Sequence, residues 1–166
     1  MNELNRIKPS LAPDIYLSVA ELFESYADAC DTGELQKWHA FFTDDAVYRV
    51  TSRENFAARL DHGDIYCDGL AMIRDRADAL QDSTVYEPRT LRHLIAHPRI
   101  RPLADGSLGA RTNFVVIEAM SDDEPQIYMA GTYEDEIVAQ QNQLKFRKRI
   151  CVYDNYRIRT SLVYPV

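Results

Sequence analysis

The chain has 166 residues, of which 46% are apolar and 27% charged, a composition that fits one globular domain and argues against disorder. Lys and Arg number 19 against 26 Asp and Glu, a formal charge of −7, which argues against nucleic-acid binding because phosphates would be repelled. Apolar runs such as 114–117 are far shorter than the ~20 residues of a membrane span, and residues 1–13 lack the apolar stretch of a secretory signal. We therefore expect a cytoplasmic protein that binds neither membrane nor nucleic acid.

The first part of the chain is predicted to be helical. Pro13 and Asp14 suit a first helical turn, because proline fixes a helical φ angle and the acid faces the positive end of the helix dipole. Apolar residues at 15, 19, 22, 23, 26 and 30 form one helical stripe, which the stop signal Asp31-Thr32-Gly33 ends. A short helix is expected over 34–40, a strand over 47–51, irregular polar chain over 51–67 and a third helix over 68–81.

The second half of the chain has the pattern of strands. Strand-like runs cover 90–101, 110–120, 126–138, 143–153 and 156–163, and short turn sequences separate them. Helices followed by consecutive antiparallel strands predict an α+β domain in which the helices pack on one curved sheet.

Charges suggest a register for one hairpin. If Glu134 lies opposite Arg147 and Glu136 opposite Lys145, then Ile137 lies opposite Leu144 on the other face. Each pair of opposite charges would contribute ~0.2–1 kcal/mol. We therefore expect antiparallel pairing in this register, and we interpret the basic run 145–149 as a solvated sheet face balanced by acids.

The side chains that could bind metals do not form a known pattern. Cys30, Cys67 and Cys151 lie far apart, which argues against a disulfide framework or a cysteine-rich site. His93 and His97 are four residues apart in a strand-like run, a span of ~13 Å that is too long for both to bind one ion. The paired Cys-x-His and Cys-x-x-His ligands of a Rieske cluster are absent, as are phosphate-binding loops. We expect this chain to bind no cofactor.

General acid–base chemistry in a pocket is the reaction type that these residues leave open. Helices against a curved sheet make a cone, whose open end could hold a small ligand. The candidate pocket residues are Tyr48, His93, Tyr128, Tyr133 and Asp135. Spacing alone does not show that any two of them converge.

Several motifs together resemble a known family. The passage Trp38-x-x-Phe41-Phe42-Thr43-Asp44-Asp45-Ala46-x-Tyr48 resembles the first helix-to-strand passage of NTF2-like (cystatin-like) cone domains. The ordered set Tyr66-x-Asp68, Ile73-Arg74-Asp75-Arg76 and Tyr86-Glu87-Pro88-Arg89-Thr90-Leu91-Arg92-His93 resembles the small (β) subunit of aromatic-ring-hydroxylating dioxygenases of the benzoate, anthranilate, salicylate or terephthalate type. The resemblance extends over about 15–163, within a single domain of 1–166 that begins with an extended arm over 1–12.

The resemblance implies a division of labour between two subunits. A partner large subunit would hold a Rieske 2Fe-2S cluster and a mononuclear Fe(II), and this chain would form a trimer within a three-plus-three hexamer that oxidises aromatic compounds. In that case no residue of this chain is catalytic. The residues that the resemblance marks as structural or interface residues are Tyr66, Asp68, Asp75, Arg76, Arg92 and His93.

Two other functions remain open on the sequence alone. The same fold serves stand-alone isomerases, dehydratases and cyclases, which would use the pocket candidates above, and it also serves modules that only bind small ligands.

Overall fold

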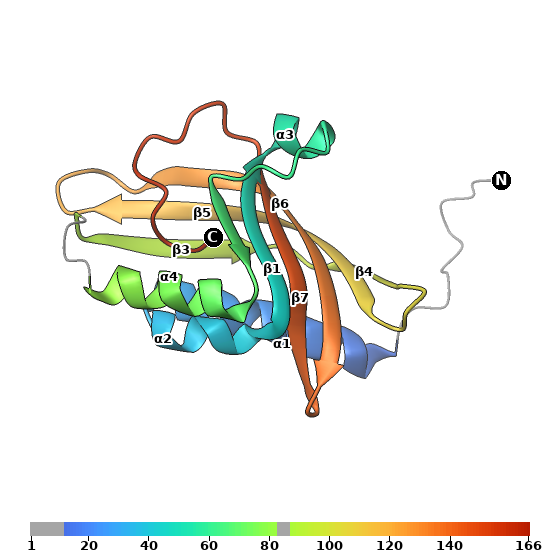
Figure 1. The fold of residues 1–166 in the computed structure, drawn as a ribbon. Helices are drawn as coiled ribbons and strands as arrows, with labels where there is room; N and C mark the ends of the chain where they lie inside the picture. The colour runs from blue at the N-terminus through green and yellow to red at the C-terminus, as the bar shows by residue number, and fades with distance from the viewer. Residues whose placement is uncertain (1–11, 83–86) are drawn as a thin grey trace.

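The computed structural model describes residues 12–82 and 87–166, so the predicted arm over 1–12 lies almost wholly outside the described residues. Helices cover one face of a strongly curved sheet, and the whole has the shape of an open cone (Figure 1). The predicted α+β architecture is confirmed. In the described residues, no helix is long and apolar enough to cross a membrane.

The helices that cover the sheet begin and end close to the predicted residues. Helix α1 runs from Pro13 to Asp31 and ends before Gly33, whose φ of +74° suits glycine. Helix α2 (Leu35–Trp38) continues into a short 3-10 helix (His39–Phe41), and α4 spans Leu70–Asp82.

The sheet has the order β2-β1-β7-β6-β5-β3, with β4 paired to β5. All pairs are antiparallel except β1 with β7, which run parallel. The strands are β1 (Phe42–Ser52), β2 (Ile65–Asp68), β3 (Arg89–Ile95), β4 (Arg99–Pro102), β5 (Leu108–Met120), β6 (Gln126–Gln140) and β7 (Gln143–Tyr153).

Three predicted stretches are corrected by the structure. The chain over 51–67 is not simply irregular, because it holds helix α3 (Arg53–Ala57) and most of β2. The single strand expected over 90–101 is two strands, since the chain between Ile95 and Arg99 leaves the ladder before Pro98. The strand expected over 156–163 does not form, because this segment folds across the mouth of the cone instead.

The β6–β7 hairpin is antiparallel as predicted, but the predicted register is wrong. Glu134 lies opposite Ile150 and Glu136 opposite Lys148. Near the turn the pairing is already displaced by two residues, because Gln140 pairs with Gln143 across the two-residue turn Gln141-Asn142 and Ile137 lies opposite Phe146 rather than Leu144. The bulge between Glu136 and Ile137 displaces the following pairs by one residue more.

The interpretation of the basic run as a solvated face is also corrected. Lys148 is exposed, but Arg149 points into the cone and its side chain is 0% exposed. Alternation along β7 places neighbouring cations of the run on opposite faces of the sheet.

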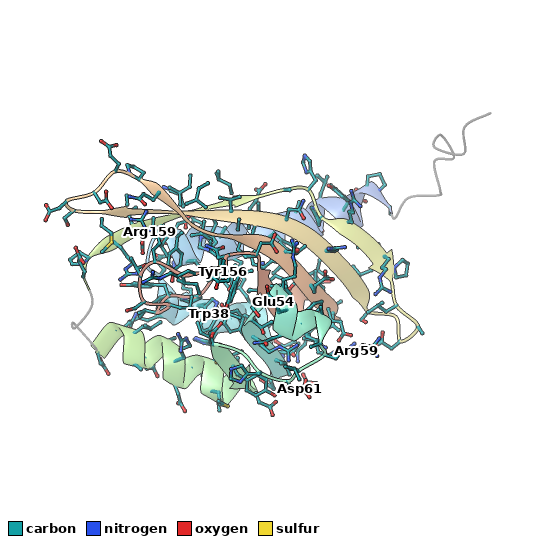
Figure 2. All side chains as sticks on the ribbon, turned by 90° about the horizontal axis from the view of Figure 1, so that it is seen from above. Trp38, Glu54, Arg59, Asp61, Tyr156 and Arg159 are labelled. Atoms are coloured by element: carbon teal, nitrogen blue, oxygen red, sulfur yellow. The ribbon has the colours of Figure 1, made fainter. Side chains whose placement is uncertain are left out.

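An aromatic cluster fills the space between the sheet and the helices. Trp38 and Tyr48 lie edge to face, with ring centroids 5.0 Å apart, and Phe42 contacts both rings. The core also includes Val166, which belongs to the segment after β7. This segment carries Tyr156 and Arg159 and runs over the sheet beside α3, the helix of Glu54 (Figure 2).

Candidate functional site

A buried arginine lies at the centre of the cone. The Arg149 guanidinium carbon is 3.9 Å from the ring centroids of both Tyr26 and Tyr133, and 4.3 Å and 4.9 Å from those of Phe146 and Phe23. Helix α1 supplies two of these rings, while β6 and β7 supply the other two. Aromatic faces attract a cation, and this attraction is stronger where water is excluded.

Asp135 is the charged partner of Arg149. The two residues lie opposite each other on β6 and β7, with 3.9 Å between Nε of Arg149 and Oδ1 of Asp135. Within the described residues, the nitrogens of Arg149, both Asp135 oxygens and the Tyr133 hydroxyl have no hydrogen-bond partner. Burial raises the pKa of Asp135 to about 7, although the charge of Arg149 opposes this rise.

Val166, in the segment after β7, occupies the depth of the cone. The carbonyl oxygen of Val166 accepts hydrogen bonds from the Tyr26 hydroxyl (2.9 Å) and the Cys151 thiol (3.3 Å), and its amide donates to the Tyr48 hydroxyl (2.9 Å). Burial raises the pKa of Tyr48 well above its ordinary value. This phenol therefore stays protonated and serves to hold the segment.

Three further side chains fix the same segment at the mouth of the cone. Arg76 of α4 donates to the Val163 carbonyl (2.7 Å), and the Tyr128 hydroxyl donates to the Ser161 carbonyl (3.1 Å). Arg89 also reaches the Ser161 carbonyl (3.2 Å). The hydrogen bonds of this segment are thus made mainly to side chains rather than to a neighbouring strand.

His93 is bonded to the end of α1. Its Nδ1 lies 2.6 Å from Oδ1 of Asp31, and its backbone amide donates to the same carboxylate. Arg92 approaches Asp31 more loosely, at 3.9 Å, and its side chain is 65% exposed. This cluster ties α1 to β3, the strand at the edge of the sheet.

The remaining sequence candidates lie apart from these groups. Tyr66 of β2 is 43% exposed. Asp68 is exposed at the end of β2, and Asp75 is exposed on α4. The structure does not bring these three residues together with His93.

The pocket candidates are distributed over several contacts rather than around one open pocket. Tyr133 and Asp135 flank Arg149, Tyr48 binds Val166, Tyr128 binds Ser161 and His93 binds Asp31. Sequence reasoning missed Asp31, which it treated only as a helix stop. It also missed that Arg149 is buried. The available signal was its position on the strand, since side chains alternate between the two faces and Lys148 beside it is exposed.

The donor set of the described residues does not suit a metal ion. No group of three or more His, Cys, Asp or Glu side chains in 12–82 and 87–166 is placed to hold one. Cys30, Cys67 and Cys151 are buried and free. Burial raises the pKa of the Cys151 thiol to about 12, so its thiolate is disfavoured as a ligand.

The fold corresponds to a known class of domain. The sequence profile of the SnoaL-like domain matches residues 14–150, most of the chain. The predicted NTF2-like cone is therefore confirmed at the level of the fold family.

Similar proteins of known name define the class more narrowly. The small subunit of anthranilate 1,2-dioxygenase from Burkholderia cepacia is 30% identical over 151 residues, covering 91% of this chain and 94% of that protein. Subunit beta 1 of the terminal oxygenase component of terephthalate 1,2-dioxygenase from a Comamonas species is 30% identical over 150 residues, covering 90% and 97%. A crystal structure of a beta subunit assigned to an aromatic-ring-hydroxylating dioxygenase of Novosphingobium aromaticivorans has a TM-score of 0.85 at 30% identity, covering 95% of this chain and 100% of that one. The chain belongs to the small (beta) subunits of aromatic-ring-hydroxylating dioxygenases.

Proposed function

We propose that this chain is the structural small subunit of a Rieske non-haem iron aromatic-ring-hydroxylating oxygenase in the cytoplasm. It supports a three-plus-three hexamer with a large subunit, and its own copies associate as a trimer. The large subunit holds the Rieske 2Fe-2S cluster and the mononuclear Fe(II), and the complex oxidises aromatic compounds. The similarity to two dioxygenase small subunits over at least nine-tenths of the chain supports this assignment.

The observation that carries the structural role is the filled cone. Val166 and Val163 are 1% and 6% exposed, and they occupy the space that a substrate would need in a stand-alone enzyme of this fold. Of the three candidate tyrosines, Tyr48 and Tyr128 are already bonded to this segment, and the hydroxyl of Tyr133 is buried in the core beside Arg149. This favours the structural role over an isomerase, dehydratase or binding module.

The sequence candidates then have roles in folding or assembly. His93 holds α1 against the sheet through Asp31, and Arg76 holds the C-terminal segment. Exposed Tyr66, Asp68, Asp75 and Arg92 are available to contact other subunits.

The test is co-expression with a candidate large subunit, chosen by its Rieske ligand spacing. We expect co-purification as one complex whose iron depends on the large subunit, measured by size-exclusion chromatography with light scattering and by an iron assay. Expression of each subunit alone is the control.

A substitution inside the cone tests the non-catalytic role. Asp135→Asn should leave the rate of ring oxidation per assembled complex within about twofold of the parent, because conservative changes remote from a reacting centre alter little transition-state binding. A collapse of this rate with normal hexamer yield and iron content would mean that the small subunit takes part in catalysis.

A further inference from the structure

The face of the sheet that points away from α1, α2 and α4 carries an unusual row of cations. Arg99 of β4 lies directly opposite Arg111 of β5, and Arg101 lies opposite Gly109. On the next strands, Glu134 of β6 lies opposite Arg111, and Glu136 of β6 lies between Gly109 and Lys148 of β7. Like charges opposite each other on neighbouring strands destabilise a sheet. The pair of Arg99 and Arg111 should therefore lower the stability of an isolated chain.

The acids on this face are already used within the chain. Glu134 pairs with Arg111 at 2.9 Å, and Glu136 pairs with Arg147 at 3.4 Å. The ion pairs found within 12–82 and 87–166 include none to Arg99, Arg101 or Lys148. We call the surface formed by Arg99, Arg101, Arg111 and Lys148 the basic sheet face.

The basic sheet face is hollowed and has apolar neighbours. These residues line a hollow of about 380 Å³, which Phe56 of α3 borders. Farther along the same side of the sheet, Leu94 is 57% exposed and Ile127 is 64% exposed. Helix α3 and the chain after it cover the β1–β7 side, where Arg49 bonds the Leu60 carbonyl and Thr51 the His62 carbonyl.

Helix α1 presents the opposite charge. Its solvent side carries Asp14, Glu21, Glu24 and Asp28, and the helix contains no Lys or Arg. None of these four acids takes part in an ion pair with another described residue. Glu21 and Glu24, three residues apart, and Glu24 and Asp28, four apart, repel each other. Leu17, 64% exposed, lies on the same side; we call this surface the acidic helix face.

We propose that the basic sheet face of one copy of this chain docks against the acidic helix face of a second copy. The two faces have opposite charge, each has exposed apolar side chains nearby, and each carries a repulsion that the other would relieve. Pairing of the basic face with itself is disfavoured, because Arg99, Arg101 and Lys148, which have no ion pair within the described residues, would meet their own copies. The contact is therefore heterologous, and such contacts close into a ring when the rotation between neighbours allows it. The inference rests on the proposed function, because it assigns the surfaces of the proposed trimer.

Charge reversal tests this pairing. Arg99→Glu with Arg101→Glu should raise the chain concentration needed for half-assembly roughly tenfold or more, and Glu21→Lys with Glu24→Lys should do the same. The variant with all four changes should return to within about threefold of the parent, because the two faces have exchanged sign. The measurement is light scattering after size-exclusion chromatography over a dilution series of the full chain, with circular dichroism to establish that each variant is folded.

The matched control is Asp78→Lys with Asp82→Lys on α4, which makes the same change of charge at exposed acids outside the acidic helix face. It should assemble like the parent.

The inference is overturned if the parent chain stays monomeric, if the reversals leave assembly unchanged, or if the fourfold variant does not recover. A monomeric chain that still forms an iron-containing complex with the large subunit would overturn this pairing alone. A chain that trimerises as described but does not bind the large subunit would overturn the proposed function alone.

Discussion

At the scale of single residues, the most unusual feature is the guanidinium of Arg149, which is fully buried and has no hydrogen-bond partner among the described residues. The faces of Arg149 are covered by aromatic rings, but its N–H groups meet only Asp135, and that at 3.9 Å. Removing one member of a buried pair leaves the other uncompensated, which typically costs more than the pair itself contributes. The core around β6 and β7 should therefore be sensitive to either partner.

Arg149→Met should lower the free energy of unfolding by about 3–5 kcal/mol, because Asp135 is left buried without a counter-ion. Urea denaturation of the isolated chain measures this. The change Arg74→Met, at an exposed position on α4, should stay within about 0.5 kcal/mol of the parent. Combining Arg149→Met with Asp135→Asn should recover part of the loss, and a double variant worse than the sum of the singles would contradict the coupling.

The stability should also depend on pH through Asp135. Burial raises its pKa from 3.8 to about 7, so the folded state binds more protons than the unfolded state between these values. This carboxyl therefore makes no unfavourable contribution below about pH 4, and it lowers stability progressively as the pH rises towards 7. Comparing urea midpoints at pH 5 and pH 8, we expect a smaller decrease for Asp135→Asn than for the parent. Equal decreases would show that Asp135 does not titrate in this range.

At the scale of elements, the C-terminal segment is held in the cone from three sides. Arg76 bonds it from α4, Arg89 and Tyr128 bond it from the sheet, and α1 reaches it through Tyr26. The segment thereby links the helices to the sheet on the side where the cone is open. Asp31 performs a similar function at the sheet's edge strand.

Arg76→Met should loosen this segment. A hydrogen bond to a charged donor contributes ~1.5–3 kcal/mol, so the amides of 160–166 should exchange with solvent roughly tenfold faster or more. Hydrogen–deuterium exchange read by mass spectrometry measures this. Arg74→Met, an exposed position on the same helix, should leave the exchange unchanged; equal acceleration by both variants would mean that the bond to Val163 does not hold the segment.

At the scale of the whole molecule, charge of the two signs is segregated. A chain of net charge −7 keeps the basic sheet face on the outside of its sheet and a helix without any basic residue on the other side. Such a distribution favours association between faces of opposite charge. It thereby determines which face of one subunit contacts which face of the next.

Association of the isolated chain should therefore weaken with salt. The Debye length falls from about 8 Å at physiological ionic strength to about 3 Å at 1 M, so the concentration of half-assembly should rise severalfold in about 1 M NaCl. Light scattering at several salt concentrations gives the slope. Association that is unchanged or stronger in salt would show that Leu94, Ile127 and their apolar contacts dominate instead.

The sequence by itself determined the elements whose signals are local. The stripe from Ile15 to Cys30, with Pro13 before it and Gly33 after it, defines α1, and the turn residues between the strands define the long hairpins. The family resemblance also came from short ordered motifs and agrees with the proteins that this chain matches. Local periodicity is sufficient here, because a helix or a hairpin is specified by residues close together in the chain.

Only the tertiary structure decided the register, the parallel pairing of β1 with β7 and the burial of Arg149. The turn at Gln141-Asn142 and the bulge after Glu136 together set the pairs of this hairpin, and nothing in the alternation of charges marks either position. Whether an arginine is solvated or buried depends on what packs over it. The rings around Arg149 come from parts of the chain that are far apart in sequence, such as Phe23 and Tyr133. The segment after β7 has the composition of a strand, but both edges of β7 are already paired, with β1 and β6, so the segment bonds to side chains inside the cone instead.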